Sequence, residues 1–311
     1  MKSIALVAGV IILCHCAVGT AAPTEKGHTF QAPGATIYVE TLGSDSGVPL
    51  VVVNGGPGFD HTYEHVALPG TTSAWETLAR KRRVVFYDQR GNGRSGTLKP
   101  GQSCKLADQI DDLEAVRAHL GAAQMDLLGH SWGGYLVMAY AARHPGHIRR
   151  LIIVDSAAPK WGDTVFLFKD VFPEGQERAN ALAFADALGD ADATEAGIRE
   201  YLHWLFYSPE KRDAFLAQVG RGVFNKAVNA AVEQDVQRFD LNPEIRKFKF
   251  PTIIITGRYD INVAPSVAYK MHQAIAGSRF VVFERSGHLP FYEEPEAFVR
   301  AIEGFLSGND R

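Results

Sequence analysis

The sequence predicts an α/β fold in which a mostly parallel central sheet has helices on both faces and carries an inserted helical cap. Three observations predict it. Short apolar segments alternate with amphipathic helical segments along most of the chain. Several of these short segments, such as Leu-Val-Val-Val at 50–53, are apolar on both faces, which is typical of buried parallel strands. The alternation is interrupted once, for about 80 residues, by sequence of helical composition.

Composition and charge exclude several classes of protein. The chain has 311 residues, of which 46% are hydrophobic and 22% charged, a balance that excludes disordered, collagen-like and polytopic membrane proteins. Its length suits one large α/β domain with an insertion, or two ordinary domains. With 32 basic and 35 acidic residues the formal charge is −3, so we expect no nucleic-acid partner.

The N-terminus has the pattern of an export signal. Lys2 is followed by an apolar run at 4–16 and by small residues at 18–22. The apolar run is shorter than the roughly 20 residues that span a bilayer. We therefore predict a signal peptide at 1–21, cleaved after Ala21, with the periplasm or the extracellular space as destination and no membrane association after cleavage. A lipid anchor on one of the early cysteines is the alternative.

Cysteines and histidines give no indication of a metal or cofactor. Cleavage would remove Cys14 and Cys16, which leaves Cys104 without a partner for an internal disulfide. We see no Cys/His cluster with zinc-site spacing, and we predict no metal and no cofactor. Most of the histidines are expected to be surface or packing residues: His61, His65, His119, His144, His147, His203 and His272.

The first part of the core is predicted at 22–159. Its strands are expected at 36–40, 50–54, 83–87, 125–128 and 151–154, and its helices at 111–120 and 132–143.

The cap insertion is predicted at 160–240, and we interpret it as a lid over the core rather than an independent domain. The second part of the core follows at 241–311. It contains strands at 252–256 and 280–283 and helices at 265–275 and 295–306.

A nucleophile is predicted where an apolar strand turns into a helix. The motif Gly129-His130-Ser131-Trp132-Gly133 is G-x-S-x-G in that setting, the nucleophile elbow. Such a turn exposes the hydroxyl of Ser131 above the sheet. A side chain at either glycine would collide as strand and helix cross.

A serine hydroxyl needs a general base, and that base needs a carboxylate to orient it. His288 follows the strand at 280–283, and Asp260 follows the strand at 252–256. Carboxyl ends of strands are where open α/β sheets place ligands. We therefore predict a catalytic triad of Ser131, Asp260 and His288, in the chain order of G-x-S-x-G hydrolases.

The loop Asn54-Gly55-Gly56-Pro57-Gly58 is predicted to complete the site. Acyl transfer develops negative charge on a carbonyl oxygen, which fixed backbone N–H groups stabilise. We assign these donors to Gly56 and to Trp132, the residue after the nucleophile. Pro57 has no N–H to contribute.

Taken together, these motifs give a family resemblance. The carrying residues are the loop at 54–58, Asp88-Gln89-Arg90-Gly91-Asn92-Gly93-Arg94-Ser95, the elbow, Gly257 to Asp260 and Ser286 to Phe291. The sequence resembles the α/β-hydrolase superfamily and, within it, the proline iminopeptidase group of serine peptidases (family S33). The resemblance covers the core, about residues 27–306, and is weak in the cap. It implies an α/β-hydrolase fold and metal-free release of an N-terminal amino acid through an acyl-enzyme.

The chain departs from that group at three places. Asn54 stands where the group usually has His, which concerns support of the loop more than its backbone donors. The segment Ile153-Val154-Asp155 replaces Leu-Arg-Gly of proline-specific members. Asn229 matches the position of a cap glutamate that binds the substrate amino group in a second subgroup.

An aminopeptidase needs a carboxylate for the substrate ammonium, since burying an unpaired charge is costly. The candidates are Glu233, one helical turn beyond Asn229, and Glu200, which precedes an aromatic cluster. For each of them, a solvated helix-face charge is the plain alternative.

Three hypotheses follow for the function. The first is a secreted serine aminopeptidase of proline iminopeptidase type, acting on short peptides or amino-acid amides. The second keeps the triad but hydrolyses esters, lactones or amides that lack a free amine. The third is a binding protein that kept the pocket and lost turnover, which an intact triad disfavours. The partner is a small-molecule or short-peptide substrate in each case, and the sequence leaves the oligomeric state open.

Overall fold

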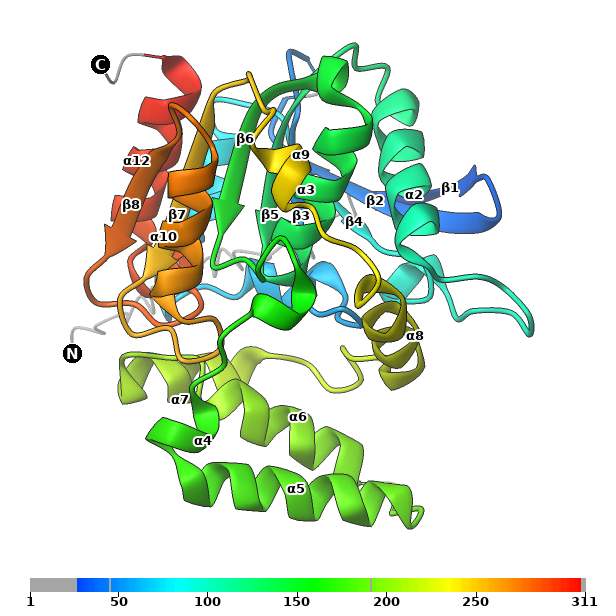
Figure 1. The fold of residues 1–311 in the computed structure, drawn as a ribbon, viewed down its shortest axis with the longest axis vertical. Coiled ribbons are helices and arrows are strands. Elements are labelled where there is room, and N and C mark those ends of the chain that lie inside the picture. Colours follow the sequence, from blue (N-terminus) through cyan, green and yellow to red (C-terminus); the bar gives the residue numbers. More distant parts are fainter. Residues whose placement is uncertain (1–26, 45, 191, 309–311) are drawn as a thin grey trace, which may run out of the picture.

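The computed structural model describes residues 27–44, 46–190 and 192–308, so the predicted signal peptide at 1–21 lies outside the described residues. In the described part, eight strands form one sheet in the order β1-β2-β4-β3-β5-β6-β7-β8 (Figure 1). The strands are β1 (Gly27–Ala32), β2 (Ala35–Leu42), β3 (Leu50–Val53), β4 (Val84–Asp88), β5 (Met125–His130), β6 (Ile148–Val154), β7 (Thr252–Gly257) and β8 (Arg279–Phe283).

The sheet is mostly parallel, as the sequence predicts. The antiparallel pairs are β1 with β2 and β2 with β4, whereas the strands from β4 to β8 run parallel. The carboxyl ends of β3, β5, β6, β7 and β8 therefore lie along one edge. The predicted functional loops follow these strand ends, so they begin along the same edge of the sheet.

Helices cover both faces of the sheet, and successive strand residues belong to two separate cores. In β3, Val51 and Val53 pack in one core with residues of α2, α3 and α10. Leu50 and Val52 pack in the other core with residues of α1 and α12. The helices of the core are α1 (Ala74–Ala79), α2 (Leu106–His119), α3 (Trp132–Arg143), α9 (Asn242–Ile245), α10 (Pro265–Ala274), α11 (Pro290–Glu293) and α12 (Pro295–Ser307).

Between β6 and β7 the chain forms a run of helices. They are α4 (Phe168–Val171), α5 (Pro173–Ala187), α6 (Ala193–His203), α7 (Pro209–Gln218) and α8 (Lys226–Val236). Helices α4 to α7 form a layer below the sheet in Figure 1, while α8 lies closer to the core. Lys160 and Asp240, at the two ends of the predicted insertion, form an isolated antiparallel bridge, so the chain leaves and re-enters the core at one place.

Several elements differ from the sequence expectation, among them the short helices α9 and α11, which were not predicted. β1 was not predicted, because most of its residues are partly or fully exposed and give little apolar alternation. α1 was also not predicted, although its capping box of Ser73 and Glu76 follows the S-x-x-E pattern. α2 begins at Leu106 rather than 111, where the Leu106 N–H donates to Asp235 Oδ2 of α8 at 2.9 Å.

Over the residues that the structure describes, no helix combines the length and the apolar character that crossing a bilayer would need.

Candidate active site

Ser131 occupies a strained turn between β5 and α3. Its backbone dihedrals, φ 56° and ψ −120°, lie in a region that residues with a side chain rarely adopt. This is the geometry expected of a nucleophile elbow. The Ser131 N–H donates to Val154 O of the neighbouring strand at 2.9 Å. A Cβ at Gly129 would collide with the backbone of Gly133, so the two glycines allow strand and helix to cross closely.

Asp260 and His288 form a buried pair. His288 Nδ1 lies 2.7 Å from Asp260 Oδ2, and the two residues are 2% and 1% exposed. The other carboxylate oxygen, Oδ1, accepts the N–H groups of Asn262 and Val263 at 2.8 and 2.9 Å. Since Nδ1–H donates to Asp260, the lone pair of a neutral His288 is on Nε2, the nitrogen that a general base uses.

The structure brings Ser131 and His288 into one pocket, which Gly55, Gly56 and Tyr201 also line. The bond between the serine hydroxyl and the imidazole is not formed among the described residues. Asn262 Nδ2 instead donates to His288 Nε2 at 3.0 Å. Asn262 thus occupies the nitrogen that Ser131 would use. Hydrogen bonds between a catalytic serine and its histidine often tighten only when substrate binds.

The predicted oxyanion donors lie beside Ser131, the predicted nucleophile. Gly56 and Trp132 line a second pocket that also contains Ser131. Gly56 has a φ of +130°, which favours glycine, and its peptide bond to Pro57 is cis. The two predicted donor segments therefore line the pocket that contains Ser131.

Gln89 connects the two donor segments. Its Nε2 donates to Asn54 O at 3.0 Å, and its Oε1 accepts Trp132 Nε1–H at 2.8 Å. Asn54 supports the loop in its turn, because its Nδ2 donates to Gly55 O at 3.0 Å and Phe59 O at 2.9 Å. Asn54, which stands where the proline iminopeptidase group usually has histidine, thus supports the loop through hydrogen bonds to backbone oxygens.

A second network, which sequence reasoning missed, joins the oxyanion loop to the histidine loop. The Gly55 N–H donates to Tyr63 Oη at 2.6 Å, and Tyr63 Oη lies 2.8 Å from His130 Nδ1. His130 Nε2 lies 2.8 Å from the backbone oxygen of His288, so Nε2 carries the proton and Nδ1 accepts from Tyr63. Burial and the neighbouring His288 lower the pKa of His130 well below its usual value, consistent with a neutral ring.

Asp155 is a further buried acid at the site that sequence reasoning did not assign a role. It directly follows β6 and has a φ of +44°, and its Oδ1 accepts the Gly257 N–H at 2.8 Å. Burial and the charge of Asp260 raise the pKa of Asp155 well above its usual range. The protonated form of Asp155 is therefore favoured near neutral pH.

The cap holds the histidine loop in place. The His288 N–H donates to Leu205 O at 2.7 Å. The buried carboxylate of Glu293 accepts N–H groups from Tyr207 at 3.1 Å, Ser208 at 2.9 Å and Gly287 at 2.6 Å. Residues of the cap are therefore part of the support of the predicted base.

The structure distinguishes the two candidate carboxylates. Glu233 of α8 lines the pocket that contains Ser131 and Asn229, and burial raises its pKa. Asn229 Nδ2 donates to Pro57 O at 3.1 Å and lies 3.4 Å from Glu233 Oε1. Among the ion pairs of the described residues, none involves Glu233.

Glu200 of α6 lies in a different environment. It lines a separate pocket with Phe172 and Trp204. Its Oε1 accepts from Arg178 Nη2 at 2.8 Å and from Trp204 Nε1 at 2.9 Å. The Glu200 carboxylate is thus already paired with a cation, away from Ser131.

Comparisons with known proteins agree with this architecture. A family model described as alpha/beta hydrolase fold matches residues 48–295. The proline iminopeptidase of Clostridium botulinum is 30% identical, over 88% of this chain and 95% of that protein. The proline iminopeptidase of Saccharolobus solfataricus is 29% identical, over 83% of this chain and 84% of that protein.

Solved structures of similar fold include proteins described by other activities. A thermophilic esterase from Thermogutta terrifontis has a TM-score of 0.68 at 25% identity, over 90% of this chain and 96% of the esterase. The enol-lactonase of Burkholderia xenovorans LB400 has a TM-score of 0.65 at 23% identity, over 90% and 100% of the two chains, a likeness of fold alone.

Proposed function

The chain belongs to the alpha/beta hydrolase fold family and to its proline iminopeptidase-like group, and from this premise we propose that it is a serine aminopeptidase. Its substrates would be short peptides or amino-acid amides, from which it releases the N-terminal residue. The reaction would proceed through an acyl-enzyme.

In this proposal the residues that take part in the chemistry have defined roles. Ser131 Oγ attacks the carbonyl carbon while His288 Nε2 takes its proton, and Asp260 stabilises the resulting imidazolium. The N–H groups of Gly56 and Trp132 bind the oxyanion, each contributing about 3 to 4 kcal/mol of transition-state stabilisation. His288 then protonates the leaving amine, and water hydrolyses the ester on Ser131.

The observation that carries the aminopeptidase assignment is the position of Glu233. Its carboxylate is half-buried, lines the pocket of Ser131 and has no cationic partner among the described ion pairs. A substrate α-ammonium placed there would supply the missing positive charge, and Asn229 would hold the carboxylate in place. Glu200 is not proposed for this role, since Arg178 already neutralises it.

The test uses Glu233→Gln with Glu200→Gln as the matched control. We expect Glu233→Gln to lower kcat/KM on aminoacyl p-nitroanilides at least tenfold, a change of about 1.4 kcal/mol, because it removes the charge and keeps the shape. Glu200→Gln should stay near wild type. Aryl esters without an amine should be hydrolysed equally by all three proteins. Equal rates on aminoacyl p-nitroanilides for all three would contradict the proposal.

The triad has its own test, which is independent of the substrate. Ser131→Ala should abolish turnover and labelling by a fluorophosphonate, while circular dichroism and thermal unfolding stay those of the folded chain. Retained turnover in Ser131→Ala would exclude the serine as nucleophile. An unlabelled wild-type protein would favour the binding-protein hypothesis.

An esterase, lactonase or amidase is the second candidate function. The pocket shared by Ser131 and His288 has apolar walls from Phe59, Leu202 and Leu205, which suit an apolar acyl group. A structural neighbour at 25% identity is described as an esterase. Faster hydrolysis of simple aryl esters than of aminoacyl arylamides, with no effect of Glu233→Gln on either, would favour this candidate.

Export from the cell, expected from the pattern at 1–21, is part of the proposal. Expression in a bacterial host, followed by N-terminal sequencing of protein from the periplasm or medium, should find a chain that begins after Ala21. An intact N-terminus on protein confined to the cytoplasm would contradict it.

A further inference from the structure

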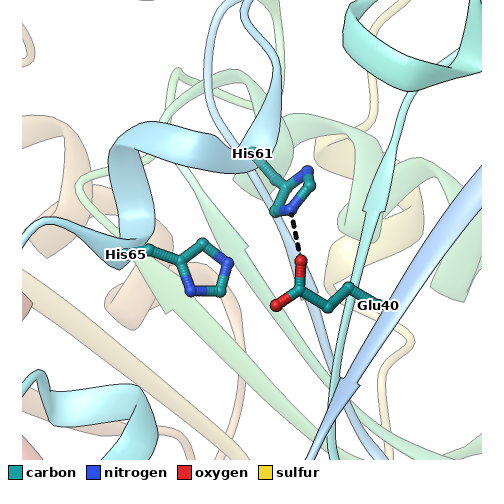
Figure 2. A group of neighbouring side chains, drawn as sticks. All are labelled: Glu40, His61 and His65. Carbon is teal, nitrogen blue, oxygen red and sulfur yellow. Dashed lines mark hydrogen bonds and ion pairs between the residues drawn. The ribbon is translucent and has the colours of Figure 1, made fainter. Parts of the chain in front are cut away.

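Two histidines and a glutamate converge outside the Ser131 pocket. His61 and His65 lie four residues apart on the 3-10 helix η1 (His61–His65), and Glu40 belongs to β2. Figure 2 shows both rings directed from η1 toward the Glu40 carboxylate. One nitrogen or oxygen atom from each residue lies within 4.8 Å of those of the other two. The segment that carries His61 directly follows the predicted oxyanion loop.

The His61–Glu40 separation suits a shared cation. His61 Nε2 and Glu40 Oε2 are 3.3 Å apart, which is long for an N–H···O hydrogen bond. Two ligands on a tetrahedral Zn²⁺, each bonded at about 2.1 Å, are separated by about 3.4 Å. The distance between His61 Nε2 and Glu40 Oε2 is therefore close to that between two ligand atoms of a tetrahedral Zn²⁺ site.

His65 provides an independent observation. Its Nε2 is buried and has no hydrogen-bond partner among the described residues. A buried polar atom without a partner is uncommon and calls for an explanation. This ring nitrogen is therefore not engaged by any other described group.

Asp88 fixes the orientation of His61. Asp88 Oδ1 lies 2.6 Å from His61 Nδ1 and also accepts the His61 backbone N–H at 3.0 Å. This leaves Nε2 directed at Glu40. A carboxylate on the far nitrogen of a histidine is the arrangement that orients metal-binding histidines in proteins.

The surroundings of His61 stabilise positive charge. The carboxylate oxygens of Asp88 and Glu40 lie 2.6 and 3.3 Å from its two ring nitrogens. Two carboxylates and the half-buried imidazole of His65 thus lie around the His61 ring.

We propose that Glu40, His61 and His65 form a binding site for one divalent transition-metal ion, for which Zn²⁺ is the best fit. The ligands would be Glu40 Oε2, His61 Nε2 and His65 Nε2, with a fourth position open to water. On binding, the proton on His61 Nε2 leaves to solvent and the ion takes its place. The ion would join β2 to η1 and so hold the segment after the oxyanion loop, without touching substrate.

A competing group on the protein surface serves as the control. Glu114, His144 and His147 also bring their ligand atoms within 4.8 Å of one another. There, however, the Glu114 carboxylate is occupied, because it accepts from Arg117 Nε at 3.0 Å and from Tyr140 Oη at 2.6 Å. His147→Ala therefore removes a histidine of similar spacing without affecting the proposed site.

The experiment titrates the EDTA-treated and dialysed chain with ZnCl₂ by calorimetry. We expect one saturable site in the wild type and a higher Tm in the presence of Zn²⁺, because a ligand of the native state stabilises it. Glu40→Gln and His65→Ala should each weaken binding at least tenfold, whereas His147→Ala should bind like wild type. Co²⁺ should give the strong visible absorption of a tetrahedral site in wild type and His147→Ala.

The outcomes that overturn the proposal are equally specific. They are the absence of saturable Zn²⁺ binding in the wild type, wild-type affinity in both Glu40→Gln and His65→Ala, or loss of binding in His147→Ala. Glu40→Gln keeps the shape of the side chain, so it remains informative if His65→Ala does not fold. Circular dichroism of each variant shows which of them are folded.

Discussion

Replacing Tyr63 by phenylalanine would remove one hydroxyl from the network that joins the oxyanion loop to the histidine loop. The ring is buried and would stay in place, so the change is confined to the hydrogen bonds. Two buried groups lose their partner: the Gly55 N–H, now 2.6 Å from the hydroxyl, and His130 Nδ1, now at 2.8 Å. Each unsatisfied group costs about 1 to 3 kcal/mol. We expect the free energy of unfolding to fall by about 2 to 6 kcal/mol.

Activity should fall as well, because Gly55 precedes the predicted oxyanion donor Gly56. We expect kcat to fall about tenfold with little change in KM, since Tyr63 positions the loop and does not contact the reacting atoms. Urea denaturation and steady-state kinetics on the same preparations measure both effects. Tyr269→Phe on α10, where the ring is 49% exposed, is the matched control. Unfolding free energy and kcat both equal to wild type in Tyr63→Phe would refute the reasoning.

Three further predictions concern Gly257, Asp155 and Glu64, whose Oε1 lies 3.8 Å from His130 Nδ1. In Gly257→Ala the new Cβ would collide with the Gly287 backbone, so we expect a loss of about 2 kcal/mol or more in urea denaturation, whereas Gly146→Ala, with open space around it, should change stability little. Burial raises the pKa of Glu64 to about 8, above its value of 4.5 in the unfolded chain, so the folded state binds the extra proton and stability should fall as pH rises from about 5 to 8. We expect wild type to lose about 3 to 5 kcal/mol relative to Glu64→Gln over that window in urea denaturation; parallel curves would contradict this. Asp155→Asn should keep kcat near wild type at neutral pH, because the acid it replaces is already protonated, whereas Asp155→Ala should cost about 1 to 3 kcal/mol of stability by leaving the Gly257 N–H unpaired. A kcat in Asp155→Asn as low as that of an inactive variant would show that the charged form is needed.

The positions of the predicted triad could be placed from the sequence because each residue adjoins a local signal. Ser131 lies between an apolar strand and a helix, and Asp260 and His288 each follow an apolar strand that the structure contains as β7 and β8. Strand order brings the ends of these strands to one edge. Local pattern and parallel topology are together sufficient for that part of the site.

The choice between Glu233 and Glu200 could not be made from the sequence, because it depends on how the cap helices pack. α8 is fixed to the core by long-range bonds, such as Asn225 N–H to Gly58 O at 2.7 Å and Asn225 Nδ2 to Gly91 O at 2.8 Å. Those partners lie more than a hundred residues away along the chain. No helical periodicity contains that information.

The supporting residues were missed for a related reason. Tyr63, His130 and Asp155 act through contacts between segments that no motif connects. His61 and His65 were expected to be surface or packing residues, although their i, i+4 spacing was visible. Only the position of β2 beside η1 shows that Glu40 faces them. Spacing along one helix identifies neighbours on that helix, but not the third ligand from another strand.

The antiparallel bridge between Lys160 and Asp240 has a consequence for how this protein can change over evolution. Because the lid begins and ends at adjacent points, a lid of another length or sequence could be grafted there without shifting any strand. The chemistry would stay with the sheet, while the range of accepted molecules would change with the graft. One condition limits such exchange: a replacement must again offer a carbonyl where Leu205 now receives the His288 N–H.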